Sequence, residues 1–163
     1  MKLLMAGILL WTSPWLAAQS TNSSGSYRYN GNGYAFATVG ACHHGYALFG
    51  GGGGGEALLW KGLAAGVEGG VYSFTDGYAF GSLQPTIGWH FVNRNVRARN
   101  EGFVNFGPGI AFGVSRGGTS PWASMGGGVI SWLNDRVGVR IEGRMQAFRS
   151  EGMFVGRIGV SFR

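Results

Sequence analysis

Two runs near the end of the sequence alternate apolar and polar residues with a period of two, which is the period of a β-strand. In the run 135–148, the apolar positions are Val137, Val139, Ile141, Met145 and Ala147, and the alternate polar positions are Arg140, Glu142, Arg144 and Gln146. In the run 153–162, Phe154, Ile158, Val160 and Phe162 alternate with Arg157, Gly159 and Ser161. An apolar face backed by charges of both signs is typical of a membrane-spanning barrel strand.

The same alternation, interrupted by turn residues, predicts six earlier strands. They lie at 33–41, 46–60, 63–74, 78–91, 102–114 and 122–133. With the two final runs they predict an all-β fold: an eight-stranded antiparallel up-and-down transmembrane β-barrel with short periplasmic turns. Strands of this length suit the roughly 9–11 tilted residues that cross a bilayer. The sheet has to close, because lipid offers no hydrogen bonds to an open edge.

Glycine is abundant, with 33 residues in the chain of 163. The interior of an eight-stranded barrel is barely wide enough for its side chains. Glycines at inward positions are therefore expected to make room for longer Arg, Glu and Tyr side chains; they are Gly66, Gly70, Gly107, Gly109 and Gly138. The glycine run at 50–55 fits either a strand that faces crowded neighbours or a flexible loop that shortens the second strand.

Composition favours lipid, and not water, around the barrel. Charged residues make up 12% of the sequence, about half the usual share of a soluble domain. The stretch 29–55 contains no Asp, Glu, Lys or Arg. A soluble lipocalin-like barrel, the alternative, would turn its apolar face inward and would need many more charges to cover its surface. We therefore expect the charges to line the interior.

The first residues predict a secretory signal peptide at 1–18, with cleavage near Ala18. Met1-Lys2 is basic, the stretch 3–10 is apolar, and the small pair Ala17-Ala18 follows Pro14. A membrane anchor is the alternative, but the apolar stretch falls short of the roughly 20 residues that a spanning helix needs. The predicted organisation is a signal peptide at 1–18, an N-terminal extension at 19–32 and the barrel at 33–163.

Three segments of the chain resemble a known family. The run 126–144, with its Gly-Gly-Gly start and its Arg-Val-Gly-Val-Arg-Ile-Glu-Gly-Arg end, and the run 156–162 are similar to the bacterial outer-membrane β-barrel domain family. The run 66–72 is similar to the third strand of that family. The resemblance implies a small barrel like OmpX or the transmembrane domain of OmpA. It also implies the bacterial outer membrane as location, with outer-membrane lipid and lipopolysaccharide as partners.

The resemblance further implies that the barrel-assembly machinery recognises the last strand by a terminal aromatic residue. Val160 and Phe162 are the candidates for this C-terminal assembly signal. Phe162 is penultimate and Arg163 follows it, which departs from the family pattern.

Barrels of this family carry ladders of Glu and Arg inside the lumen, and the resemblance implies such a network here. The candidate residues are Glu68, Arg140, Glu142, Arg144 and Arg157. Because a lone buried charge is costly, these groups are expected to neutralise one another and to plug the lumen. The alternative is a proton or small-ion path through the same groups.

Aromatic residues near the strand ends predict girdles at the two membrane interfaces. One girdle would contain Tyr78, Trp122 and Phe148, beside the external loops, and the other would contain Trp60, Trp89 and Trp132. The expected external loops, at 42–46, 73–78, 115–121 and 148–152, are short, which disfavours a large adhesive surface.

The sequence predicts no metal site and no nucleic-acid partner. Cys42, His43 and His44 are consecutive, and neighbouring strand side chains diverge, so they do not converge on one ion. A single cysteine forms no internal disulfide. The basic residues are spread along the chain, apart from Arg94, Arg97 and Arg99 in a connection between strands, where a solvated turn is the simpler interpretation.

Catalysis and cofactors are not expected either. Hydrolysis or acyl transfer on lipid A needs an activated nucleophile, such as a Ser held by a His and a carboxylate. His43 and His44 have no such Ser nearby, and His90, beside Asn93 and Arg94, is predicted to be a solvated rim residue. Large-solute transport is disfavoured, because porins need about 16–18 strands.

The predicted function is therefore structural: envelope integrity or surface interaction by a monomeric barrel without catalytic activity. The alternatives are a lipid A-modifying barrel enzyme and a narrow ion-conducting channel.

Overall fold

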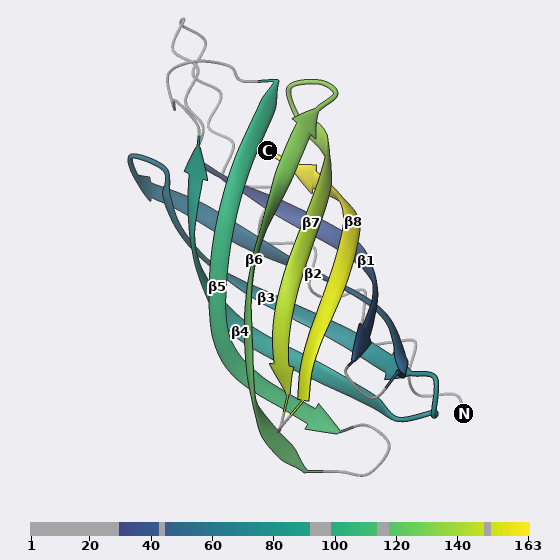
Figure 1. Cartoon of the computed structure of the whole chain (residues 1–163). Coiled ribbons are helices and arrows are strands. Elements are labelled where there is room, and N and C mark those ends of the chain that lie inside the picture. Colours follow the sequence, from purple (N-terminus) through teal and green to yellow (C-terminus); the bar gives the residue numbers. More distant parts are fainter. Residues whose placement is uncertain (1–29, 43–44, 92–98, 114–117, 149–150) are drawn as a thin grey trace, which may run out of the picture.

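A computed structural model describes residues 30–42, 45–91, 99–113, 118–148 and 151–163 (Figure 1). The predicted signal peptide at 1–18 lies outside these residues, as do His43, His44, Arg94 and Arg97. Of the predicted extension at 19–32, only the last three residues are described. The described part contains no helix that is long and apolar enough to cross a membrane.

Eight antiparallel strands close into one barrel in sequence order, as predicted, and they wind around it at a tilt (Figure 1). The barrel closes between the first and last strands, from Gly33 opposite Phe162 to Cys42 opposite Met153. The strands are β1 (Gly31–Cys42), β2 (Ala47–Trp60), β3 (Leu63–Phe74), β4 (Ala79–Phe91), β5 (Asn100–Gly113), β6 (Thr119–Trp132), β7 (Val137–Phe148) and β8 (Glu151–Phe162). We call the end at which β1 begins and β8 ends the near end, and the opposite end the far end.

The two faces of the barrel wall are inverted relative to a soluble protein, as the alternation predicted. On β7, Ile141 and Met145 are 61% and 63% exposed, whereas Arg140 and Arg144, each one residue before them, are buried. The outer surface is therefore apolar and the charged side chains of this strand face the lumen, which suits a barrel surrounded by lipid.

Some strands are longer than predicted, because their backbone pairing continues beyond the residues that alternate between apolar and polar. β1 begins at Gly31, which pairs with Ala57, so two residues of the predicted extension belong to the barrel. β5 begins at Asn100, opposite Ser131, which places Glu101 inside the lumen. The near end of the lumen therefore holds a buried carboxylate that the predicted strand did not include.

The glycine run at 50–55 is part of β2 and pairs on both sides, with β1 and with β3. Its inward members lie directly against aromatic rings of the lumen. A Cβ atom at Gly50 would lie 2.7 Å from Tyr72 Cδ1, and one at Gly54 would lie 2.8 Å from Tyr34 Oη. Of the two alternatives, the strand is confirmed by this pairing, and glycine at its inward positions leaves space for the rings.

Two prolines interrupt the seam between β4 and β5. The register runs through Leu83–Ile110 and Ile87–Phe106 with no pair between them, and Pro85 and Pro108 face each other in this gap. The backbone N–H of His90 points toward β3, and that of Gly113 points toward β6. Because this direction alternates from residue to residue along a strand, the backbone nitrogens of Pro85 and Pro108 point toward each other across the seam. Since proline has no N–H, neither can donate. Gln84, which lies in this gap, is held by side chains of the lumen.

Candidate functional site: the filled lumen

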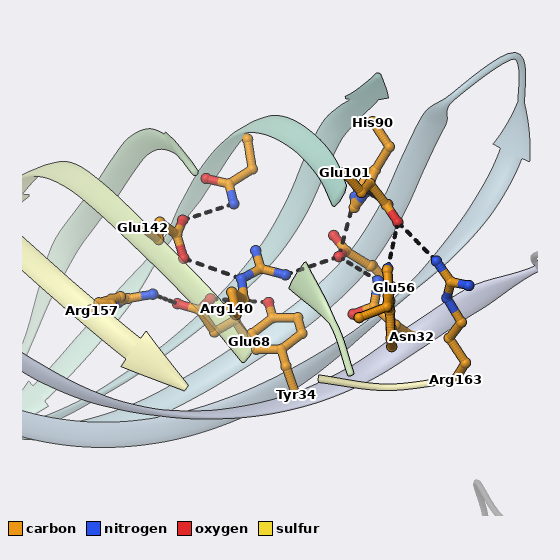
Figure 2. Close-up of polar contacts among 12 residues, drawn as sticks. Asn32, Tyr34, Glu56, Glu68, His90, Glu101, Arg140, Glu142, Arg157 and Arg163 are labelled. Carbon is orange, nitrogen blue, oxygen red and sulfur yellow. Dashed lines mark hydrogen bonds and ion pairs between the residues drawn. The ribbon is translucent and has the colours of Figure 1, made fainter. Parts of the chain in front are cut away.

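The five charged residues predicted to form the lumen network are all buried, and ion pairs link them into one group. Figure 2 labels four of them. We call this group the charged network; it consists of Glu68, Arg140, Glu142, Arg144 and Arg157. It joins β3, β7 and β8 across the interior, and β7 supplies three of its members at alternate, inward positions. Alternation along one strand therefore explains why these charges converge.

Glu68 is the centre of the charged network. Arg144 binds it through two nitrogens, with Nη1 2.9 Å from Oε1 and Nη2 2.8 Å from Oε2. Arg157 donates from Nη1 to Oε1 at 2.9 Å. Tyr34 and Gln84 each donate a further hydrogen bond, both at 3.0 Å. Two-nitrogen binding of a carboxylate by Arg fixes geometry as well as charge.

Arg140 links the charged network to the near end, as Figure 2 shows. Its Nε lies 3.4 Å from Glu142, and its Nη1 donates to Glu56 at 3.1 Å. The guanidinium also lies between two rings, 4.2 Å from the centroid of Tyr34 and 3.8 Å from that of Phe103. Glu142 further accepts hydrogen bonds from Arg144 Nε and from Asn105. Each carboxylate of the network therefore meets at least two donors.

A second group of titratable residues fills the near end, and it was not predicted as a site. His90 was expected to be a solvated rim residue, and this is wrong: its side chain is 1% exposed. It lies between Glu101 and Glu56, and Arg163 approaches Glu101 at 3.4 Å. His90 lies on the same face of its strand as Gln84 and Thr86, and this pattern was a signal for burial. Glu101 was missed because β5 was expected to begin after it.

The aromatic girdles are only partly where the sequence placed them. Trp60 and Trp89 face outward, 61% and 40% exposed, and their girdle role stays a prediction. Tyr78, Trp122, Trp132 and Phe148 point into the lumen and are buried, so their assignment to girdles is wrong. Both Trp122 and Trp132 occupy inward positions of β6, because side chains alternate between the two faces of a strand. Their buried indole N–H groups have acceptors: Trp122 donates to Gln84 at 2.8 Å and Trp132 to Glu101 at 3.1 Å.

Inward-facing rings close the far end of the lumen. The aromatic plug, as we call it, comprises Tyr72, Tyr78, Phe80, Trp122 and Phe148. Phe80 and Phe148 stack with ring centroids 4.7 Å apart and an interplanar angle of 3°. The aromatic plug packs with Leu48, Met153 and Val155, so the far end is filled by apolar contact and not by charge.

The side chains at the end of β8 and directly after it point to opposite sides of the barrel wall. Val160 and Phe162 face outward, and their role as assembly signal stays a prediction. Arg163 turns toward the lumen, where its guanidinium lies 3.7 Å from the centroid of Trp132.

Among the described residues, the buried carboxylates and guanidiniums match in number. Four carboxylates (Glu56, Glu68, Glu101 and Glu142) face four guanidiniums (Arg140, Arg144, Arg157 and Arg163). No group of three potential metal ligands occurs in the described part of the chain. These eight groups thus fill the interior and balance one another's charge, apart from any charge on His90.

This fold and this interior define the class of protein: a closed, eight-stranded transmembrane β-barrel with a filled lumen. The chain is similar in structure to Neisserial surface protein A, with a TM-score of 0.61 and 12% identity over 85% of this chain and 99% of that one. It is similar to the N-terminal β-barrel domain of Pseudomonas aeruginosa OprF, with a TM-score of 0.55 and 17% identity over 81% and 98%. It is also similar to the outer membrane enzyme PagL, with a TM-score of 0.57 and 13% identity over 80% and 99%.

No protein-family model matches the chain, and no protein with a curated description matches it. At these identities the structural likeness concerns the fold. The predicted resemblance to small OmpA-like barrels is confirmed at that level.

Proposed function

We propose that this protein is a small outer-membrane β-barrel with a structural role in the cell envelope, either in its integrity or in surface interaction, and that the charged network closes its lumen. The observation that carries the proposal is the environment of Glu68. Two guanidiniums from β7 and β8 and two neutral donors from β1 and β4 bind one carboxylate on β3. Such a centre ties opposite walls of the barrel together and occupies the space that a channel would need.

The proposed location rests on the outer surface and on the structural neighbours. Large apolar side chains cover the outside, among them Ile87, Phe106, Ile141, Phe154 and Ile158. A surface of this kind is stable in lipid and not in water. Outer-membrane lipid and lipopolysaccharide are the proposed surroundings, and the barrel-assembly machinery is the proposed partner during insertion. We propose a monomer that binds no nucleic acid.

We propose no catalytic activity. A catalytic histidine has to reach its substrate, and His90 is enclosed by carboxylates inside the lumen. PagL is an outer membrane enzyme of the same fold, so an enzyme stays the alternative, with the lipid A-modifying activity considered from the sequence. Activity on lipid A in detergent that disappears in His43→Ala or His44→Ala would favour that alternative.

Electrophoretic mobility of the refolded protein, heated against unheated, tests the proposal, with circular dichroism on the same sample. We expect a β-rich, heat-modifiable species that forms only with detergent or lipid. Glu68→Ala should lose the heat-resistant band at a lower temperature than the parent, because Arg144 and Arg157 lose their shared partner. A β-rich protein that is soluble without detergent would contradict the membrane assignment. An unchanged melting temperature of the band in Glu68→Ala would contradict the role of the charged network.

A further inference from the structure

The near end of the lumen places one imidazole between two carboxylates. His90 Nδ1 contacts Glu101 on the neighbouring strand β5, and Nε2 lies 3.2 Å from Glu56 on β2. All three side chains are buried (Figure 2). The ring also stacks on Phe103, with centroids 5.6 Å apart, which holds its plane in place.

The number of protons in this group decides whether both contacts are attractive. A neutral imidazole has one N–H and one lone pair, and an ionised carboxylate has only lone pairs. If the imidazole were neutral and both carboxylates were ionised, one ring nitrogen without a hydrogen would face a carboxylate oxygen. The lone pairs of these two atoms would repel each other. Both contacts become attractive only when the group holds one more proton, which gives the imidazole two N–H groups or protonates one carboxylate.

The surroundings allow this proton to come and go. The groups that face the site are Asn32 on β1, Trp132 on β6, Arg140 on β7 and Arg163 after β8. Asn32 and Arg140 donate to Glu56 at 2.9 and 3.1 Å. Trp132 and Arg163 donate to Glu101 at 3.1 and 3.4 Å. Each carboxylate therefore keeps donors of its own when the imidazole has only one N–H.

We propose that Glu56, His90 and Glu101 form a proton-binding site that fastens β2 to β4 and β5 across the near end of the lumen. β2 and β4 are not neighbours in the sheet, since β3 lies between them, so the imidazole makes a contact that backbone pairing cannot make. The bound proton is the ligand of the site. Its loss turns one His–Glu contact from attraction to repulsion and releases the tie between these strands.

The sign of the pH effect follows from proton linkage. A proton lost from the site removes an attractive contact from the folded barrel and none from the unfolded chain. Folding stability therefore decreases as the pH rises through the titration of the site. For one proton, the folding equilibrium constant falls by at most about tenfold per pH unit.

Urea unfolding of the refolded full chain in lipid vesicles, from about pH 5 to about pH 9, tests the proposal. The parent protein should lose stability as the pH rises. His90→Gln should lose this pH dependence, because its amide does not titrate. The double variant His43→Gln/His44→Gln is the matched control and should keep the pH dependence of the parent. An equal pH dependence in the parent and in His90→Gln would overturn the proposal.

A measurement that leaves His90 in place keeps the test decisive if His90→Gln fails to fold. In ¹⁵N-histidine NMR spectra of the refolded barrel, with His43→Gln/His44→Gln to isolate the signal, His90 should show two protonated ring nitrogens or one proton shared with a carboxylate. A single ring N–H with a free lone pair over the whole pH range would overturn it. Neither result depends on where the barrel resides in the cell, so failure here differs from failure of the proposed function.

Discussion

The two ends of the lumen fill the same narrow barrel by different physical means. At the far end, the aromatic plug packs ring against ring, and Phe80 and Phe148 stack in parallel. In the middle and at the near end, carboxylates and guanidiniums fill the space, held by direct hydrogen bonds. The aromatic plug depends on shape, whereas the charged network depends on shape and on charge together. A substitution that preserves volume should therefore separate the two regions.

The energetic logic differs in the same way. Burial of apolar area stabilises the far end roughly in proportion to the area, with a smaller gain from ring geometry. Buried ion pairs contribute little net stability relative to an apolar core, because desolvation offsets the attraction, but removal of one partner leaves an uncompensated charge. The charged network is therefore expected to be sensitive to single substitutions and to select one arrangement of the strands.

The largest effect is expected for Arg144→Met, which keeps most of the volume of the side chain and removes its charge. Glu68 loses its two-nitrogen partner and Glu142 loses a donor, so the free energy of unfolding should fall by about 3–5 kcal/mol. Urea titration of the refolded barrel measures it. Gln146→Met is the control on the same strand: its amide is buried with no hydrogen-bond partner among the described residues, so the change should be neutral or stabilising. Equal losses in the two variants would remove the distinction based on charge.

The glycines of β2 should show that packing limits both regions alike. Gly50→Ala would press a methyl group against Tyr72 of the aromatic plug, and Gly54→Ala would press one against Tyr34 beside the charged network. Each should destabilise the barrel by about 1–3 kcal/mol. At Gly55 the nearest atom would lie 3.7 Å away, so Gly55→Ala is the control and should fold with the stability of the parent. A harmless Gly50→Ala or Gly54→Ala would show that the rings and the neighbouring backbone of β3 both have room to move.

A volume-conserving change in the aromatic plug's surroundings should cost much less than Arg144→Met. Met153 packs against the plug from β8, and Met153→Leu exchanges one apolar side chain for another of similar size. The expected loss is below about 1.5 kcal/mol, measured by the same urea titration. A loss as large as that of Arg144→Met would mean that the far end is also held by specific geometry, and the comparison between the two ends would fail.

The smallest effect is expected for Tyr34→Phe, which removes one neutral donor to Glu68 and leaves both guanidiniums in place. The loss should be about 1 kcal/mol. Combined with Arg144→Met, it should show non-additive coupling in a double-mutant cycle, since both groups bind the same carboxylate. Strict additivity would indicate that the two donors act independently.

Strand parity explains what the sequence could reveal. On β7, charges alternate with apolar residues without interruption, so the sequence alone assigns Arg140, Glu142 and Arg144 to the lumen. Glu68 and Arg157 followed from the same period. The barrel itself was predictable because each strand carries such a pattern between turn residues.

Three features could not be obtained from local pattern. Proximity to a loop suggested girdles for Trp122 and Trp132, but parity relative to the partner strand decides whether a strand-end aromatic faces lipid or lumen. The second is Glu101, which became visible only when pairing extended β5 beyond its alternating part. The contact of His90 with Glu56 spans two strand spacings, and no sequence period encodes it.

We propose that ion pairs and aromatic rings together close the lumen from end to end. Conductance of the refolded protein in a planar lipid bilayer tests it most directly, with insertion verified by heat-modifiable mobility of the same preparation. A closed lumen should pass no steady ion current above that of the bare bilayer. A stable, reproducible single-channel conductance from the inserted parent protein would contradict it.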